Sequence, residues 1–472
     1  MTFTSSGANT RYPRIACAAL LLFTAFTVRP AVADLFTAST AYEAKDFDRA
    51  FKEFRALAEL GQPLAQFNVA VMYSRGEGTR ESELNAYAWA MVAADNGESR
   101  AKEFADKLRL QLAPGSEKLA EDIRTRYGRT ALEAHLLPRI EDDPAMTKLR
   151  NKRCRPLSGF RPSYPPDAAQ QRIQGNVYVE YTLMPDGHPR NTRITYATPA
   201  GVFDDNVRNA MLRVEFMPGE HGDPPLDCEI MFQFIMSDSP AGGTASSELV
   251  AYLNKTRKQA EGGDAQAQTL YGMMTQGLPQ LHGTRSDALP WFLKAAQSGA
   301  PVAQFEVGYS LLKGLGCHCE EDKAMFWLGR AAAADESDAQ VVLARALLSD
   351  RNVPDRYNRA AVWLERAAKL NDHDGTMYLS ALLAASPEAT LRDPKRSLQL
   401  LEKIFSHLGN NPSAHEIRAA AQANLGDFTA AVKSQSDAIK IAGKLHWDLT
   451  AQNTRLASYQ SKQPWYGDLL EF

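Results

Sequence analysis

The sequence predicts an α+β protein, in which an α-solenoid of helix-pair repeats flanks a small αββαβ module. The solenoid is predicted by a tryptophan that recurs every 36 residues in the second half of the chain, since a fixed period of this length is typical of stacked helix pairs. The module is predicted over 155–237, where the helical period gives way to the alternation of strands. The length of 472 residues exceeds what one core organises, so several domains are expected.

Residues 1–33 predict a secretory signal peptide. Arg11 and Arg14 precede an apolar run over 15–28, and an Ala-Val-Ala cleavage site ends at Ala33. The run of 14 residues is short for a bilayer span, which needs about 20 apolar residues. We expect cleavage after Ala33 and export to the periplasm; the alternative is an uncleaved leader that anchors the chain in the inner membrane.

The charge of the chain is nearly balanced, with 53 Lys and Arg against 56 Asp and Glu. No strong field of either sign points to nucleic acid or to an anionic membrane surface as a partner. Protein or peptide partners in the cell envelope are expected instead. No integral membrane segment is expected in the mature chain, because no segment after the leader is long and apolar enough.

The second helix of each predicted repeat has the pattern Ala-x-x-Trp-x-x-x-Ala-Ala, at 288–296, 324–332 and 360–368. Spacings of three and four place these side chains on one helical face, where the alanines let a neighbouring helix approach closely. A single unit cannot bury such a face, so neighbours must stack. The tryptophans of the pattern are therefore expected to be core residues rather than ligand contacts: Trp89, Trp291, Trp327 and Trp363.

Other short elements repeat together with the tryptophans. Ala-Gln recurs at 267–268, 303–304 and 339–340, and one more copy of the signature near the start has Gly76-x-Gly78 before its tryptophan. These residues resemble the Sel-one-like repeat family, a subclass of tetratricopeptide-type helical repeats. The resemblance implies paired helices with small-residue contacts and Gly-x-Gly turns.

The resemblance places the repeats in two arrays, at 34–136 and 248–472. The pattern weakens toward the end of the second array, where Gln399 stands at the expected tryptophan step. Residues 425–438 resemble half of an ordinary tetratricopeptide repeat. We expect the last stretch, 444–472, to cap the superhelix or to stay partly ordered.

The module between the arrays is predicted to have the order helix, strand, strand, helix, strand. Apolar and polar side chains alternate over 177–183, which indicates the first strand, and Pro-Asp-Gly at 185–187 supplies a hairpin turn. The return strand is expected over 190–197, a helix over 204–212 and the last strand over 228–236.

A set of residues stands at fixed places in this module: Tyr164-Pro165, Ile173, Gly175, Asp186-Gly187, Phe203-Asp204, Ala210, Arg213, Phe216 and Pro218. Together with the element order they resemble the carboxy-terminal domain of TonB-type proteins over about 80 residues, with Val214 where an aromatic residue is expected. The resemblance implies an envelope domain that binds a peptide as an added strand at an open sheet edge.

The last strand is the candidate for that edge, and its partner-binding residues are expected to be Glu229, Ile230, Met231, Phe232, Gln233 and Phe234. The alternative is an edge covered by a linker or by flanking helices, as unprotected edges usually are. Two segments rich in Pro, Gly, Ser or basic residues, 137–161 and 237–247, are predicted to be these linkers.

Four cysteines remain after the predicted cleavage: Cys154, Cys228, Cys317 and Cys319. An even count in an exported protein permits two disulfides, whose connectivity the sequence leaves open. A bridge between Cys154 and Cys228 would tie the segment before the module to its last strand. Cys317-His318-Cys319 offers three metal ligands, but a closed zinc site needs four, so no metal site is predicted.

One short motif suggests an enzyme. Ser310-Leu-Leu-Lys313 matches the Ser-x-x-Lys nucleophile pattern of penicillin-recognising enzymes, but the companion Ser-Asp-Asn and Lys-Thr-Gly elements are missing. The sequence therefore predicts no catalytic residue, no cofactor and no enzyme activity. A penicillin-interacting cell-wall enzyme stays as an alternative through Ser310.

The function predicted from these features is that of an exported periplasmic scaffold or adaptor, which binds protein partners through repeat surfaces and a sheet edge. A TonB-type energy transducer that acts on outer-membrane receptors is the other alternative, if the leader is kept as an anchor. The chain departs from transducers because it has no long proline-rich spacer and because a long repeat array follows the module. A binding function is thus predicted in preference to energy transduction.

Overall fold

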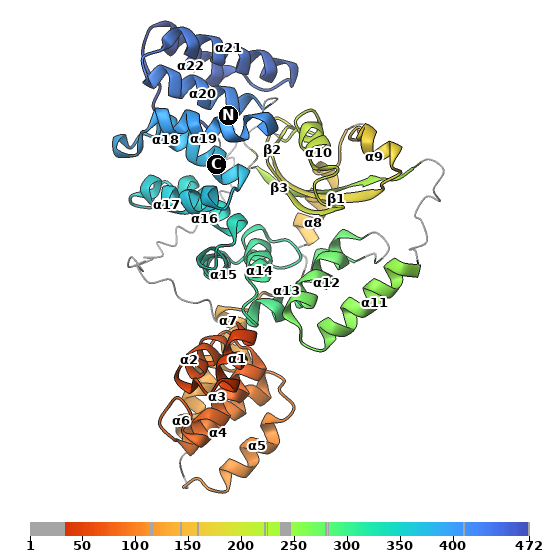
Figure 1. The fold of residues 1–472 in the computed structure, drawn as a ribbon, viewed down its shortest axis with the longest axis vertical. Coiled ribbons are helices and arrows are strands. Elements are labelled where there is room, and N and C mark those ends of the chain that lie inside the picture. The colour runs from red at the N-terminus through yellow and green to blue at the C-terminus, as the bar shows by residue number, and fades with distance from the viewer. Residues whose placement is uncertain are drawn as a thin grey trace, which may run out of the picture.

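The computed structural model describes residues 34–470 except 114, 116, 142–143, 158–159, 221–222, 224, 237–246, 279–280, 282 and 409–410. The predicted signal peptide and almost all of the second predicted linker therefore lie outside the described residues. The described chain is an α-solenoid with one three-stranded sheet, in agreement with the predicted fold class (Figure 1). None of its helices is long and apolar enough to cross a membrane.

The amino-terminal array is built from short antiparallel helices, followed by two more helices that lead to the module. Their bounds are α1 Leu35–Glu43, α2 Phe47–Ala58, α3 Pro63–Arg75, α4 Glu83–Asp95, α5 Ala101–Arg109, α6 Glu117–Tyr127, α7 Arg129–His135 and α8 Pro144–Arg153. The turn after α3 needs glycine, because Gly76 and Gly78 have φ values of 67° and 66° and a Cβ on Gly78 would lie 2.0 Å from the Phe47 carbonyl oxygen. The predicted Gly-x-Gly turn is confirmed.

The module has the predicted order of elements, α9 Pro166–Gln170, β1 Gly175–Leu183, β2 Pro189–Thr198, α10 Asp204–Met211 and β3 Leu226–Phe234. The sheet is antiparallel with the order β2-β1-β3, so β1 is central and β2 and β3 are its edges. The last strand begins and ends two residues earlier than expected.

One face of the sheet packs on the helices of the module. Val177, Val179 and Tyr181 of β1 are buried there with Phe203 beside α10, and the ring of Phe203 stacks on Phe234 with centroids 4.1 Å apart. These residues form a core of their own, as expected of an independent domain.

The segment predicted as the first linker, 137–161, is partly helical, so that prediction was wrong over α8. Arg150 of α8 donates to the carbonyl oxygens of Asp227 at 3.0 Å, Gly314 at 2.9 Å and Lys313 at 2.7 Å. Such contacts with distant residues favour a helix where local composition indicates a loop.

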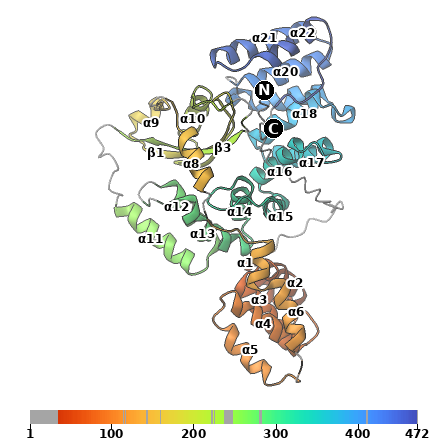
Figure 2. The ribbon, with the colours of Figure 1, turned by 180° about the vertical axis from the view of Figure 1, so that it is seen from behind.

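The carboxy-terminal array curves around the module (Figures 1 and 2). Its helices are α11 Ser247–Glu261, α12 Ala265–Gly277, α13 Arg285–Gln297, α14 Pro301–Lys313, α15 Glu321–Ala333, α16 Ser337–Ser349, α17 Arg356–Lys369, α18 His373–Ala385, α19 Pro394–Leu408, α20 Pro412–Asn424, α21 Phe428–Lys444 and α22 Thr450–Gln460, with a short 3-10 helix at Ala389–Leu391. Leu469 and Leu470 are buried in the core of α16–α20, so the segment after α22 is ordered and folds back onto the array, whereas the predicted alternatives were a cap or partial order.

The recurring Ala-Gln pairs have one structural role. The amide nitrogens of Gln268, Gln304 and Gln340 donate to the carbonyl oxygens of Ala260, Ala296 and Ala332 at 3.0–3.1 Å, eight residues earlier in each case. Each glutamine thus adds a second hydrogen bond to a carbonyl at the end of the preceding helix, which already accepts the backbone N–H of the residue three positions later.

The two arrays are packed together although the module separates them in sequence. The Leu35 amide donates to the Ser298 carbonyl at 3.1 Å, and the indole of Trp327 donates to the Leu136 carbonyl at 2.9 Å. One continuous apolar core contains residues of α2–α4 and of α13–α15. The arrays therefore form a single support, and the module lies against the curve of the second one (Figure 2).

Candidate functional site

The side chains of β2 bind the module to the inner side of the carboxy-terminal array. Asn191 accepts a hydrogen bond from Tyr378 of α18 at 2.9 Å, and Arg193 pairs with Asp338 of α16 at 3.1 Å. The guanidinium of Arg190 lies 3.7 Å from the ring centre of Trp447. The first half of β2 is thus covered by the array.

A cluster of charged side chains lies between the sheet and α13–α14. Glu180 is 1% exposed, and its carboxylate forms salt bridges with Arg193 at 2.7 Å and with Arg285 at 3.1 Å. Arg285 also pairs with Glu306 at 2.7 Å and lies 3.7 Å from Glu229. Buried charges require such partners, because an unpaired ion away from water is very costly.

This charged cluster contains more carboxylates than guanidiniums, with Glu180, Glu229, Glu306 and Asp338 against Arg193 and Arg285. Burial raises the pKa of Glu229, of Glu306 and of Asp338. Burial alone would lower the pKa of Arg285, but the surrounding carboxylates outweigh it and raise that pKa.

The charged cluster was not predicted from the sequence. Glu180 was expected only on the polar face of β1, and its partners lie in β2, in β3 and in helices far along the chain. The available signal was a glutamate in the middle of a strand and an arginine, Arg285, in the first turn of a repeat helix. The sequence alone does not indicate that these two residues pair, because only the fold brings them together.

Ser310 contacts this charged cluster and does not have the surroundings of the nucleophile that the enzyme alternative requires. Its side chain is 0% exposed, and its hydroxyl oxygen accepts a hydrogen bond from Arg285 Nε at 3.0 Å. Lys313 pairs with Asp227 of β3 at 3.1 Å and so does not act as a base for Ser310. Both residues of the Ser-x-x-Lys match thus have a role in docking the sheet, Ser310 through Arg285 and Lys313 through Asp227. This arrangement gives no support to the enzyme alternative.

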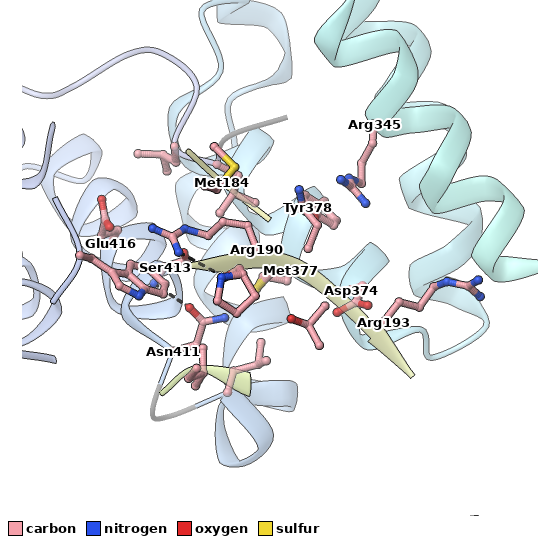
Figure 3. A pocket seen from close by; sticks show the side chains of 18 of the residues that line it. Met184, Arg190, Arg193, Arg345, Asp374, Met377, Tyr378, Asn411, Ser413 and Glu416 are labelled. Atoms are coloured by element: carbon pink, nitrogen blue, oxygen red, sulfur yellow. Dashed lines mark hydrogen bonds between the residues drawn. The ribbon is translucent and has the colours of Figure 1, made fainter. Parts of the chain in front are cut away.

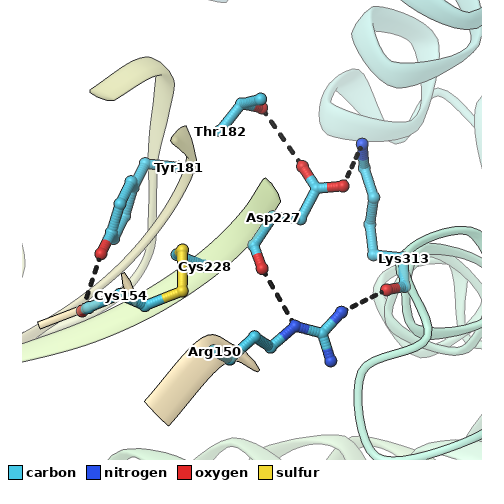
Figure 4. Close-up of a disulfide and its surroundings, with 7 residues drawn as sticks. All are labelled: Arg150, Cys154, Tyr181, Thr182, Asp227, Cys228 and Lys313. Carbon is cyan, nitrogen blue, oxygen red and sulfur yellow. Dashed lines mark hydrogen bonds and ion pairs between the residues drawn. A yellow bond between two sulfur atoms is a disulfide. The ribbon is translucent and has the colours of Figure 1, made fainter. Parts of the chain in front are cut away.

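The disulfide between Cys154 and Cys228 is present, with the two Cα atoms 5.6 Å apart (Figure 4). The hydroxyl of Tyr181 donates to the Cys154 carbonyl at 3.0 Å, and Arg150 on the same helix end binds the Asp227 carbonyl. The bridge therefore fastens the end of α8 to the first half of β3.

The other two cysteines are not bridged to each other. Cys317 is buried, whereas Cys319 keeps a thiol that donates to the Leu312 carbonyl at 3.3 Å. His318 lies 3.5 Å from Glu141. In the part of the chain that the structure describes, no group of three His, Cys, Asp or Glu side chains could hold a metal ion.

Within the described parts of the chain, the edge formed by β3 is covered only at its beginning. The Asp227 carbonyl accepts a hydrogen bond from Arg150, which lies outside the sheet, so this carbonyl points away from β1. The pairing of β1 with β3 has no bulge, so the alternation of inward and outward groups continues along β3. Main-chain groups of an antiparallel strand point alternately to either side, so those of Glu229, Met231 and Gln233 also point away from β1. Among the described residues no further strand pairs with β3.

The six residues of the candidate edge therefore divide into groups. Glu229 belongs to the charged cluster, and Ile230, Phe232 and Phe234 pack on the core of the module. Met231 is half-buried, Gln233 is exposed, and the following Ile235 is 44% exposed. A partner would meet the second half of the strand.

The four repeat tryptophans are not equivalent. Trp89 and Trp327 are buried, but Trp291 and Trp363 are only half-buried. The residue after the tryptophan is fully buried in each of the four repeats: Ala90, Phe292, Leu328 and Leu364. Trp89 and Trp327 have additional neighbours, the ring of Tyr127 and the carbonyl of Leu136, and these contacts explain why one period places its tryptophans at different depths.

Known families match both parts of the chain. The Sel1 repeat matches residues 63–98, 301–336 and 337–372, and the Gram-negative bacterial TonB protein C-terminal matches 161–236. The protein TonB of Escherichia coli strain K12 is 43% identical over 68 residues, and that of Klebsiella pneumoniae is 40% identical over 68 residues. Each match covers 14% of this chain and 28% of the relative, so the chain spans less than a third of the TonB proteins that it matches.

Two solved structures are similar to the repeats. A Sel1 repeat protein from Oxalobacter formigenes is 21% identical, with a TM-score of 0.33, over 41% of this chain and 82% of that one. A protective antigen of uropathogenic Escherichia coli strains, which displays an SLR fold, is 15% identical, with a TM-score of 0.35, over 90% of this chain and 81% of that one. The chain thus combines Sel1 repeats with a TonB carboxy-terminal-like domain, as predicted.

Proposed function

We propose that this protein is an exported scaffold of the cell envelope, which holds protein partners on its repeats and a peptide segment on the outer half of β3. The observation that supports this most is the contrast within one strand. The first half of β3 is fastened to α8 and α14, while the main-chain groups of Met231 and Gln233 point away from the sheet. An extended peptide would gain hydrogen bonds there, and exposed side chains would select it.

The repeats support a holding role, because solenoids offer extended surfaces to other proteins. Most of the inner curve of the carboxy-terminal array is already occupied by the module. Protein partners are therefore expected on the amino-terminal array and on the outer sides of the helices. The likeness to TonB and the predicted leader favour the periplasm as the compartment.

Site-specific photo-crosslinking in the cell that makes the protein tests the peptide site. A crosslinking amino acid in place of Gln233 is expected to capture a specific product, and Met231→Pro in the same chain is expected to abolish it, because proline removes an outward N–H. The matched control places the crosslinker at Arg351, which is exposed after α16. Identical products at both positions, or products that survive Met231→Pro, would contradict strand addition.

The energy-transducer alternative rests on the likeness of the module to TonB. It requires that residues 1–33 stay on the chain as an anchor. Sequencing the amino terminus of the protein from cells separates the two proposals. A start at Asp34 leaves a released scaffold, whereas an intact leader supports the transducer.

A further inference from the structure

A cavity of about 530 Å³ lies where the module meets the carboxy-terminal array (Figure 3). One wall is the β1–β2 hairpin with α10, and the other is formed by α16, α18 and the segments around Asn411 and Trp447. Small-molecule sites commonly have about 300–1,000 Å³ and favour such domain interfaces. No residue of β3 lines the cavity, so it is separate from the proposed peptide edge.

Three charged side chains in this cavity come from three different elements: Arg208 of α10, Arg345 of α16 and Asp374 of α18. Within the described chain, none of the three forms an ion pair or a hydrogen bond, and Arg345 Nε is buried without a partner. All three side chains line the same cavity, and both guanidiniums act electrostatically on the carboxyl of Asp374.

Other charged residues of the cavity are paired, as Arg193 is with Asp338 and Arg455 with Glu416. Asp374 lacks such a partner, and burial raises the pKa of its carboxyl from 3.8 to about 6. A cation seated beside this carboxyl would lower that pKa again. The cavity therefore offers two positive groups and one negative group that form no hydrogen bond or ion pair within the described chain, although Arg345 also lies 5.8 Å from the ring centre of Tyr378.

We propose that this cavity binds a free amino acid or a short peptide, whose carboxylate is held by Arg208 and Arg345 and whose ammonium group is held by Asp374. The planar fork of arginine matches a carboxylate with two parallel hydrogen bonds. Met377 and Tyr378 of α18 and Leu212 after α10 supply apolar wall for a side chain. Such a ligand contacts module and array together, so it stabilises their docked arrangement.

Titration calorimetry on the full wild-type chain tests the proposal with dialanine, N-acetyl-dialanine, dialanine amide and the twenty free amino acids. Saturable binding with a dissociation constant of about 1 mM or tighter is expected for dialanine or for at least one amino acid. Blocking either charged end is expected to weaken binding at least about tenfold, because a charged hydrogen bond is lost. The absence of saturable binding, or equal binding of the blocked forms, would overturn the proposal.

Two variants assign the charged ends to residues. Arg345→Met is expected to weaken the free ligand at least about tenfold, and Asp374→Asn to remove the advantage of the free ligand over its N-acetyl form. Arg351→Met and Asp350→Asn are matched controls, since both side chains are exposed outside the cavity. If Arg345→Met does not fold, Arg208→Met tests the same contact from the module. Full affinity in the cavity variants, or the same loss in the controls, would refute the assignment.

Discussion

The two edges of the small sheet face different surroundings. Along β2, Asn191, Arg193 and Arg190 each contact a different part of the carboxy-terminal array. Along β3, only the first residues are fastened, by α8, the disulfide and Lys313. Edges are usually protected against unwanted pairing, and here the array lies against β2, while α8, the disulfide and Lys313 hold the first residues of β3.

The difference teaches that a polar strand face is not always a water-facing one. Glu180 and Arg193 alternate with apolar residues as expected of an exposed face, yet Glu180 is buried and the side chain of Arg193 is only 13% exposed beside α13, α14 and α16. Charged side chains of the array, such as Arg285 and Asp338, form the ion pairs that hydration would otherwise replace. The outer half of β3 keeps the ordinary exposure, and this makes it the candidate for an external partner.

The largest expected effect comes from breaking the covered side. Arg285→Met leaves Glu180 and Glu306 without their shared partner, so the free energy of unfolding is expected to fall by about 3–5 kcal/mol. Urea denaturation measures this change. Arg257→Met, which breaks an exposed pair with Glu261 on α11, is the matched control and is expected to change little. Equal losses in both variants would mean that the charged cluster does not hold the module.

Removing the disulfide tests the fastened half of β3. Replacing Cys154 and Cys228 together by serine is expected to lower the free energy of unfolding by about 2–4 kcal/mol, because the bridge closes a loop across 74 positions of sequence. The same denaturation experiment, with and without a reducing agent, measures it. Cys319→Ser is the control, since this thiol lies outside the bridge. A double variant as stable as the wild type would contradict the role of the bridge.

The docked side of β2 is also expected to respond to pH. Burial, with Asp338 and Glu306 nearby, raises the pKa of Glu336 from 4.5 to about 7. Since the pKa is raised in the folded state, its contribution to stability is fully present below pH 4.5 and is lost as the pH rises through about 7.

The wild type is therefore expected to be more stable near about pH 5 than near about pH 8, with about 1–3 kcal/mol of this difference due to Glu336. Glu336→Gln should remove that part, and Glu321→Gln, at an exposed position of α15, should not. Thermal unfolding across this range measures the effect. A profile that Glu336→Gln leaves unchanged would refute the assignment.

The smallest effect is expected on the open half of β3. Met231→Pro removes an N–H that points away from β1, so stability should change by less than about 1 kcal/mol. Ile230→Pro removes an N–H of the ladder and should cost about 3 kcal/mol. Unfolding midpoints of the two variants measure this contrast. If the costs were reversed, the outward groups would be those of Ile230 and Phe232 instead.

Local repetition made much of the fold predictable. The alanine pairs and the Ala-Gln pairs are determined by contacts between adjacent helices, such as that of Gln304 with Ala296, and adjacent helices are close in sequence. The alternation over 177–183 likewise predicted β1, and the helix and strands around it followed in order. The bridge between Cys154 and Cys228 was expected because both residues flank one module.

The tertiary structure was needed wherever residues far apart in sequence decide the outcome. Ser310 matches a nucleophile pattern in the sequence, but in the fold its hydroxyl is buried and bonded to Arg285. Similarly, α8 forms in a predicted linker, where Arg150 binds β3 and the end of α14. The unpaired groups of the cavity belong to three elements that no local pattern connects.

By itself, then, the sequence predicted the repeats, the order of helices and strands along the module and one candidate disulfide, because these depend on periodicity and on neighbouring elements. Which edge of the sheet is covered was decided only by the tertiary structure. Glu180 and Arg285 are 105 positions apart in the sequence. A buried charge is tolerated only where the fold places an oppositely charged group beside it. The same long-range pairing covers β2 and leaves the outer half of β3 uncovered.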